Sequence, residues 1–211
     1  MTLIAIIVAN ILPSLKGFSD DFFFRKYEFH LSSVRAGQQY RMITSGFLHV
    51  DMAHLAFNMI TLYFFAPVVL NYFNDISFLF IYFFSLLAGG LFALYFHQNE
   101  PSYRAVGASG AVTGILYSAI LLNPSMNLYM FFIPIPIPAY IFGIGYLIYS
   151  IYGMKNRMDN IGHSAHFGGA IGGFASTLFL KPYLITSHPL MIVLLLIPII
   201  ILFILHKQNK I

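Results

Sequence analysis

The sequence predicts an all-α integral membrane protein with one polytopic domain. Hydrophobic residues make up 59% of the 211 residues and charged residues only 9%, whereas soluble domains carry about 25% charged residues. The mean hydropathy is +0.79. Long apolar stretches recur along the whole chain, and a backbone inside lipid must satisfy its own hydrogen bonds, which favours helices. The lipid bilayer is therefore the first expected partner.

Seven apolar stretches approach the length of about 20 residues that crosses the hydrocarbon core. The first lacks the basic start and the small-residue cleavage site of a signal peptide, so we expect a retained span. The fourth is short, about 24 Å as a helix, and we expect its N-terminal end to lie inside the membrane. The stretches lie at 2–15, 52–73, 76–96, 107–122, 137–154, 161–180 and 189–206.

Two connections between these spans have distinctive compositions. Residues 16–49 hold 8 of the 18 charged residues together with several aromatic residues, a mixture typical of a segment in the membrane interface. Prolines at 134, 136 and 138 predict a stiff, extended linker between the fourth and fifth spans. The polar stretch HQNEPSYR at 97–104 is expected to help water approach the interior of the bundle.

The charge pattern excludes some functions and sets an orientation. The chain has no cysteine, which excludes disulfides and cysteine metal sites. The net charge of +4 comes from residues that flank the spans, so no nucleic-acid partner is predicted. With seven spans, ten of the eleven basic residues lie on one side. The positive-inside rule places that side, which includes residues 16–49, in the cytoplasm.

Polar residues inside spans are costly and are functional candidates for that reason. His54 and Asn58 are four residues apart and share one face of the second span. Two interpretations are open for this pair. It forms hydrogen bonds between helices, or it donates hydrogen bonds to a negative charge that develops during a reaction.

A serine opens the fourth span within the stretch GASGAVTG at 107–114. Gly110 and Gly114 form a small-xxx-small pair, which is typical of closely packed membrane helices. Ser109 is either part of this packing surface or a nucleophile that needs space around it. The sequence of the sixth span bears on this choice.

The sixth span contains His166 followed by a second glycine pair, Gly169 and Gly173. If the two glycine faces pack together, Ser109 and His166 approach one another. Serine becomes a strong nucleophile when a base takes its proton, and a neutral imidazole is suited to that role. The nearest acid, Asp159, is seven residues from the histidine in a predicted loop, so a Ser–His dyad fits better than a triad.

A metal site is the competing interpretation of the histidines. His163 and His166 are three residues apart, and His49 and His54 are possible further ligands. However, the chain has no H-E-x-x-H motif, and no glutamate lies in a span to act as a base. We therefore predict neither a metal nor another cofactor.

Taken together, these motifs resemble the rhomboid family of intramembrane serine proteases. The resemblance rests on YRMITSGFLHVDMAHLAFN at 40–58, VGASGAVTG at 106–114 and AHFGGAIGG at 165–173, in that order. It implies a six-helix transmembrane bundle over residues 1–180. Residues 181–211 then supply a seventh, C-terminal helix and a short basic tail. It also implies hydrolysis of peptide bonds in or near transmembrane segments of other membrane proteins, without a cofactor.

The resemblance assigns roles to individual residues. Ser109 matches the nucleophile and His166 the general base. His54, Asn58 and the backbone N–H of Ser109 match the groups that stabilise the oxyanion. Arg41, after Tyr40, resembles the aromatic–Arg pair of the first loop. The residues expected to shape or support the site are Gly107, Ala108, Gly110, Gly114, Gly169, Gly173, Arg41 and His49.

The chain departs from the family pattern at Thr113, where many relatives carry an aromatic residue that stacks on the base histidine. We expect His166 to be held less firmly or by another side chain.

The resemblance also implies that residues 16–49 face outward, opposite to the orientation that the basic residues predict. We expect a multi-pass protein in the plasma (inner) membrane of a prokaryote. The alternative is a non-catalytic rhomboid-like protein that binds transmembrane helices. The sequence leaves the oligomeric state unknown.

Overall fold

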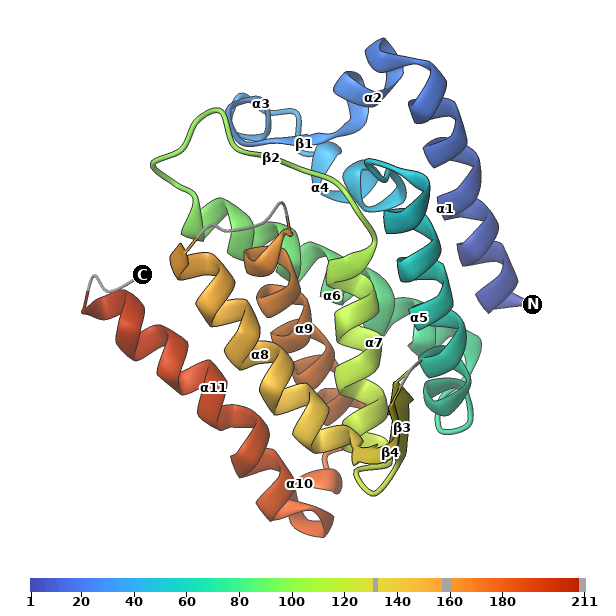
Figure 1. The fold of residues 1–211 in the computed structure, drawn as a ribbon, viewed down its shortest axis with the longest axis vertical. Helices are drawn as coiled ribbons and strands as arrows, with labels where there is room; N and C mark the ends of the chain where they lie inside the picture. Colours follow the sequence, from blue (N-terminus) through green and yellow to red (C-terminus); the bar gives the residue numbers. More distant parts are fainter. Residues whose placement is uncertain (131–132, 157–160, 209–211) are drawn as a thin grey trace.

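A bundle of long helices forms most of the molecule (Figure 1). The computed structural model describes residues 1–130, 133–156 and 161–208. A helix occupies each of the seven predicted apolar stretches, which confirms the all-α membrane fold. The long helices are α1 Thr2–Ser19, α5 Met52–Leu70, α6 Asp75–Phe96, α7 Ser109–Leu122, α8 Ala139–Asn156, α9 His163–Leu180 and α11 Pro189–Lys207.

Four of the described helices, α1, α5, α6 and α11, are long and apolar enough to cross a membrane by length and composition. Helix α7 is shorter, and all its residues from Gly110 to Leu122 are buried. A helix that is apolar on every side belongs in the interior of a bundle. In Figure 1, α7 lies between α5 on one side and α8 and α9 on the other. The hydrophobic core consequently lies on both sides of α7.

Short elements fill the connections between the long helices. Residues 16–49 fold into several of these short elements at one end of the bundle. The short elements are α2 Asp21–Tyr27, β1 Phe29–His30, α3 Leu31–Arg35, α4 Arg41–Thr44, the 3₁₀ helix η1 Ser45–Phe47, β2 Arg104–Ala105, β3 Asn127–Met130, β4 Ile133–Pro138 and α10 Leu184–Ser187.

Most predicted span boundaries differ from the structure by a few residues. Helix α1 continues to Ser19, beyond the predicted end at residue 15. The apolar run ends at residue 15, but the helix continues for one more, largely polar turn. Asp20 then caps α2 by accepting a hydrogen bond from the N–H of Phe23 at 2.9 Å. Helix α7 begins at Ser109 instead of residue 107, and its 14 residues make it shorter than predicted. The proline-rich segment is extended, as predicted, but strand β4 pairs antiparallel with β3.

Helices α7 and α9 touch through their backbones. A Cβ atom built on Gly169 would lie 2.0 Å from the carbonyl oxygen of Gly110, and one built on Gly173 would lie 2.1 Å from that of Gly114. No real side chain tolerates such distances, so only glycine permits this packing. The hydroxyl of Ser118 adds a hydrogen bond to the Gly173 carbonyl at 3.3 Å.

The glycine contact generates a test of stability. Gly169→Ala places a methyl group against the backbone of α7, and we expect it to lower the free energy of unfolding by about 1–3 kcal/mol. Thermal unfolding in detergent measures the change. Gly145→Ala on α8 is the matched control, because nothing lies within 4 Å of a Cβ built there. Equal stability of the two variants would contradict the proposed packing constraint.

Candidate active site

Ser109 is the first residue of α7 and is half-buried. The first N–H groups of a helix have no partner within the helix. They point toward whatever lies beyond the helix N-terminus, where the helix dipole favours negative charge. The backbone therefore presents hydrogen-bond donors beside the Ser109 hydroxyl.

The turn before this serine requires glycine at position 107. Gly107 has φ = +128°, a conformation that L side chains rarely adopt. A Cβ atom at this position would lie 2.8 Å from Cε1 and 2.9 Å from Nε2 of His54, and 3.6 Å from Oγ of Ser109. The absence of a side chain thus lets the His54 imidazole and the Ser109 hydroxyl lie close to the Gly107 backbone.

Two backbone hydrogen bonds hold this turn against the segment that precedes α5. The N–H of Gly107 donates to the carbonyl of Ser45 at 3.0 Å. The N–H of Ala108 donates to Nε2 of His49 at 3.4 Å. Ala108 is fully buried. The residues that lead into α7 are consequently fixed from outside the helix.

His49 is fully buried and bonds on both ring nitrogens. Its Nδ1 lies 2.9 Å from the hydroxyl of Ser14 on α1, and that hydroxyl donates to the carbonyl of Phe47 at 3.1 Å. Because the Ser14 hydroxyl donates its proton to Phe47, Nδ1 of His49 must carry a hydrogen and donate to Ser14. Nε2 of His49 then accepts from the N–H of Ala108. Burial, with a smaller contribution from the nearby His54, lowers the pKa of His49 to about 3. His49 is therefore a neutral connector between α1 and the turn before α7.

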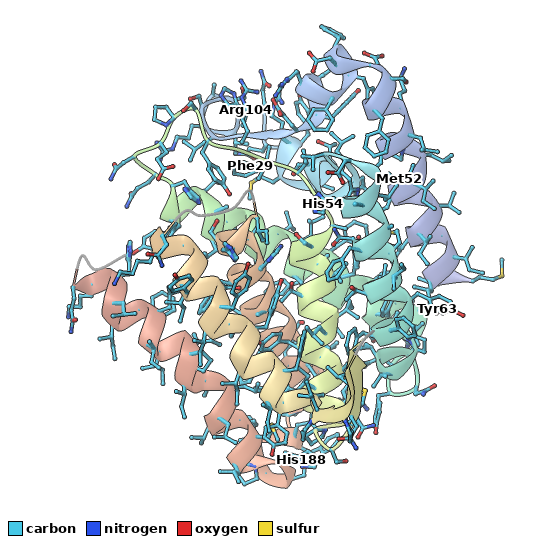
Figure 2. The ribbon with its side chains drawn as sticks, viewed as in Figure 1. Phe29, Met52, His54, Tyr63, Arg104 and His188 are labelled. Atoms are coloured by element: carbon cyan, nitrogen blue, oxygen red, sulfur yellow. The ribbon has the colours of Figure 1, made fainter. Side chains whose placement is uncertain are left out.

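His54 and Asn58 lie on α5 as the sequence predicts. The carboxylate of Asp51 caps the helix by accepting from the N–H of His54 at 2.7 Å. Figure 2 shows His54 near the start of α5, beside the chain that leads into α7. Asn58 is buried, and its amide donates to the backbone carbonyl of His54 at 3.0 Å. The His54 ring thus lies against Gly107, and the Asn58 amide bonds to its own helix.

His166 lies on the first turn of α9 and is 7% exposed. The residue before it, Ala165, has its carbonyl oxygen 3.2 Å from a Cβ built on Gly110, the residue after Ser109. The chain neighbours of the serine and the histidine therefore contact each other. The glycine faces bring the two helix beginnings together, as the sequence suggested.

Tyr146 is a contact of this histidine that the sequence did not reveal. Its hydroxyl lies 2.7 Å from Nδ1 of His166. The two rings stack with centroids 5.8 Å apart and an interplanar angle of 22°. A tyrosine in an apolar helix such as α8 carries no motif that distinguishes it from a packing residue. The aromatic support that is missing at Thr113 is thus supplied by another helix.

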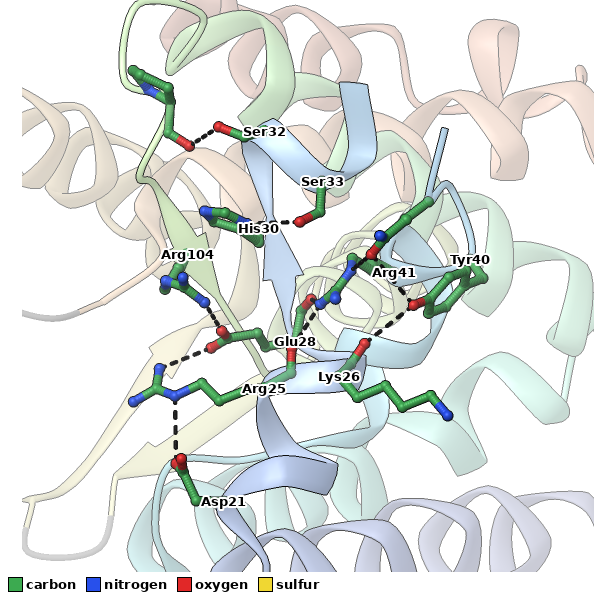
Figure 3. Close-up of polar contacts among 12 residues, drawn as sticks. Asp21, Arg25, Lys26, Glu28, His30, Ser32, Ser33, Tyr40, Arg41 and Arg104 are labelled. Carbon is green, nitrogen blue, oxygen red and sulfur yellow. Dashed lines mark hydrogen bonds and ion pairs between the residues drawn. The ribbon is translucent and has the colours of Figure 1, made fainter. Parts of the chain in front are cut away.

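Residues 16–49 are bound to the chain between α6 and α7. Strand β1 pairs antiparallel with β2, with His30 opposite Arg104. Figure 3 shows the carboxylate of Glu28 between the guanidinium groups of Arg25 and Arg104. Glu28 is 2% exposed, and a buried carboxylate is stable only when it is paired. The ion pairs therefore lock this segment over the chain that leads to Ser109.

Arg41 is also buried and organises the same segment from within. Its guanidinium donates to the backbone carbonyls of Arg25 and Glu28, both at 2.8 Å, and to the side chain of Gln38 at 2.6 Å (Figure 3). Tyr40 lies beside it, 5.7 Å from the guanidinium carbon to the ring centroid. Arg41 therefore holds the fold of residues 25–41, and its site-shaping role stays a prediction.

The polar stretch at 97–104 lies against the first turn of α9. His97 Nε2 is 3.0 Å from the hydroxyl of Ser164, and the rings of His97 and Tyr103 stack 3.6 Å apart. These residues line a cavity of about 160 Å³, which also includes His163. Cavities with several polar groups are suited to hold water.

The remaining histidine of the sixth span, His163, lies with its ring centroid 6.2 Å from that of His166. His163 is buried, and its ring lies close under Gly153 of α8. In the part of the chain that the structure describes, no group of three or more His, Cys, Asp or Glu residues is placed to hold a metal ion. Asp159, the nearest acid in sequence, lies outside the described residues.

Comparison with known proteins finds a family model, described as the Rhomboid domain, that matches residues 36–183. RHOMBOID-like protein 12, mitochondrial, of Arabidopsis thaliana is 32% identical over 79% of this chain and 54% of its own length. Rhomboid protease GluP of Bacillus subtilis (strain 168) is 32% identical over 68% of this chain and 26% of its own length. Inactive RHOMBOID-like protein 8 of Arabidopsis thaliana is 34% identical over 71% and 41%. The chain spans about half, or less, of the length of these relatives.

The buried His49 predicts a specific dependence of stability on pH. Its pKa is about 3 in the folded protein and about 6.5 in an unfolded chain. The unfolded chain therefore binds a proton first, and stability falls as the pH drops from 6.5 toward 3, by up to about 1.4 kcal/mol per pH unit. We expect His49→Gln, whose amide can still bond to both Ser14 and Ala108, to reduce this slope. Thermal unfolding between pH 4 and pH 8 tests it, and an unchanged slope in the variant would refute it.

Proposed function

Because the chain belongs to the rhomboid family, we propose that it is an intramembrane serine endopeptidase. It hydrolyses peptide bonds in or near transmembrane segments of other membrane proteins. Ser109 is the nucleophile and His166 is the general base. The proposal follows from the site as well as from the family, because the relatives include a protein named inactive.

The contact between Gly110 and Ala165 is the observation that carries this proposal. These residues are the direct neighbours of Ser109 and His166, and a Cβ on the first would lie 3.2 Å from the carbonyl oxygen of the second. Tyr146 occupies Nδ1 of His166. The proposal assigns the other ring nitrogen, Nε2, to Ser109.

The proposed reaction proceeds in two steps, both of which use this histidine. The Ser109 oxygen attacks the carbonyl carbon of the scissile bond while Nε2 of His166 takes the hydroxyl proton. His166 then passes the proton to the departing amine, which leaves an acyl-enzyme. A water molecule attacks the acyl carbon and gives its proton to His166. The carboxyl product leaves as the proton returns to Ser109.

The negative charge on the carbonyl oxygen develops in the space beside Gly107. The backbone N–H of Ser109 at the start of α7 and the imidazole of His54 supply donors there. Asn58 contributes through the second N–H of its amide, because the first is bonded to the His54 carbonyl. The small residues around Ser109 favour a substrate with a small side chain at the cleavage point.

The proposal includes the wider organisation of the chain. Residues 1–180 form the catalytic unit, and residues 181–211 add the seventh helix and a basic tail. The partners are transmembrane protein substrates within the lipid bilayer. Residence in a prokaryotic plasma membrane is a separate prediction. Similar proteins include two with mitochondrial names and two from Bacillus subtilis, so they do not select one membrane.

A non-catalytic protein that binds transmembrane helices is the second candidate. The resemblance to Inactive RHOMBOID-like protein 8 favours it. The presence of both Ser109 and His166 in one contact region favours the protease. A fluorophosphonate probe separates the two functions, since it labels only an activated serine. Labelling that is absent in the wild-type protein would favour the non-catalytic candidate.

The first prediction from this function concerns the dyad. In purified protein assayed on a transmembrane substrate, Ser109→Ala and His166→Ala should each lower kcat by about 10⁴-fold or more. Ser176→Ala is the matched control, because this buried serine on α9 donates to the carbonyl of Gly173 in its own helix and has no other hydrogen bond among the described residues. Full cleavage by either dyad variant would sink the proposal.

The second prediction separates the two members of the oxyanion pair. His54→Ala should lower kcat by about 10²–10³-fold with little change in KM, because its ring borders the space where the charge develops. Asn58→Ala should have a smaller effect, since one N–H of its amide is bonded to its own helix. Steady-state kinetics measures both effects. A larger loss for Asn58→Ala than for His54→Ala would reverse these assignments.

A further inference from the structure

A second side chain lies near the Tyr146 hydroxyl, in addition to His166. The Thr113 side chain, one turn after Ser109 on α7, lies near the Tyr146 hydroxyl. Thr113 is 4% exposed. Side chains from α7, α8 and α9 thus gather at the Tyr146 hydroxyl, in the order Thr113, Tyr146 and His166. Building on the proposed function, we propose that Tyr146 is a positioning residue that fixes the tautomer and the ring orientation of His166, with Thr113 orienting the phenol.

The hydrogen positions follow from the role of the histidine. A neutral imidazole has one N–H donor and one bare acceptor nitrogen. A base for Ser109 needs the acceptor at Nε2, so the hydrogen must sit on Nδ1. The Tyr146 oxygen then accepts that hydrogen at 2.7 Å. The phenol proton then needs its own acceptor, and in this proposal that acceptor is the hydroxyl oxygen of Thr113.

The ring contact restricts the histidine further. The Tyr146 and His166 rings are inclined by only 22°, so the imidazole cannot rotate about its bond to Cβ without losing the stack. Gly169, one turn further along α9, sets the distance between this helix and α7. Backbone contact therefore places His166 near Ser109, and Tyr146 decides which nitrogen points there.

A phenol suits this position better than a carboxylate would. When His166 takes a proton, Nδ1–H becomes a stronger donor and its bond to the phenol strengthens. A carboxylate would give a stronger bond, but an ionised acid among buried helices is costly. Tyr146 supplies the acceptor without adding a charge. A neutral side chain thereby takes the place that an acid holds beside the histidine of a Ser–His–Asp triad.

The test combines four variants with two measurements. Tyr146→Phe keeps the ring and removes the hydroxyl, and Thr113→Val keeps the shape of the side chain and removes its oxygen. The double variant combines both changes. Tyr152→Phe is the matched control, a tyrosine on the same helix that is 55% exposed. The measurements are kcat and KM on a transmembrane substrate, and the ¹⁵N chemical shifts of His166 in histidine-labelled protein.

We expect Tyr146→Phe to lower kcat by about tenfold or more with little change in KM. Thr113→Val should cause a smaller loss of the same kind. The double variant should lose no more than Tyr146→Phe, because both substitutions break one chain of hydrogen bonds. The ¹⁵N shifts should show His166 in the Nδ1–H form in the wild type and in a mixture of tautomers in Tyr146→Phe. Tyr152→Phe should match the wild type in both measurements.

Two results would overturn the inference. One is a His166 tautomer that is the same in the wild type and in Tyr146→Phe. The other is a kcat for Tyr146→Phe equal to that of the wild type. The tautomer is measurable whether or not the protein cleaves anything. Suppose that the wild-type protein cleaves no substrate, but that Tyr146→Phe still loses the Nδ1–H form of His166. That result would reject the proposed function and leave the role of Tyr146 intact.

Discussion

The backbone contact between α7 and α9 is the constraint on which the rest of the structure depends. Gly169 and Gly173 bring their helix against the carbonyl oxygens of Gly110 and Gly114. In lipid, helices gain little from the hydrophobic effect, and close packing of small residues is one of the few forces that join them. The same contact brings the beginnings of the two helices together. Stability of the bundle and assembly of the candidate site therefore rest on the same four glycines.

A second set of contacts orients the start of α7 from outside the bundle. The N–H groups of Gly107 and Ala108 bond to Ser45 and His49. The ion pairs of the buried Glu28 hold strand β1 beside β2, only a few residues before that turn. Most of these partners lie far away in sequence and touch no candidate reacting atom. They fix the backbone conformation on which the position of Ser109 depends.

The sequence predicts the helices and the glycine faces because each rests on a local pattern, whereas the candidate dyad rests on the resemblance and stays a prediction. Hydropathy indicates the membrane spans, and the spacing of the glycines indicates which helix faces pack together. The end of α1 was predicted too early because its polar last turn resembles a loop. The hairpin of β3 and β4 was missed because pairing depends on a partner strand that proline spacing does not reveal. Tyr146 was missed for a similar reason, since its contact with His166 is set by the packing of α8 and not by any motif.

The order of the helices along the chain has a consequence for biosynthesis under the proposed function. Ser109 begins α7, but His166 and its glycine face arrive on α9, with Tyr146 on the helix between them. A nascent chain that has inserted only as far as α8 holds the serine without its base. The peptidase would thus stay inert while its own spans and those of neighbouring nascent proteins pass into the bilayer. It would become competent only when α9 docks, so completion of the fold would act as the activating event.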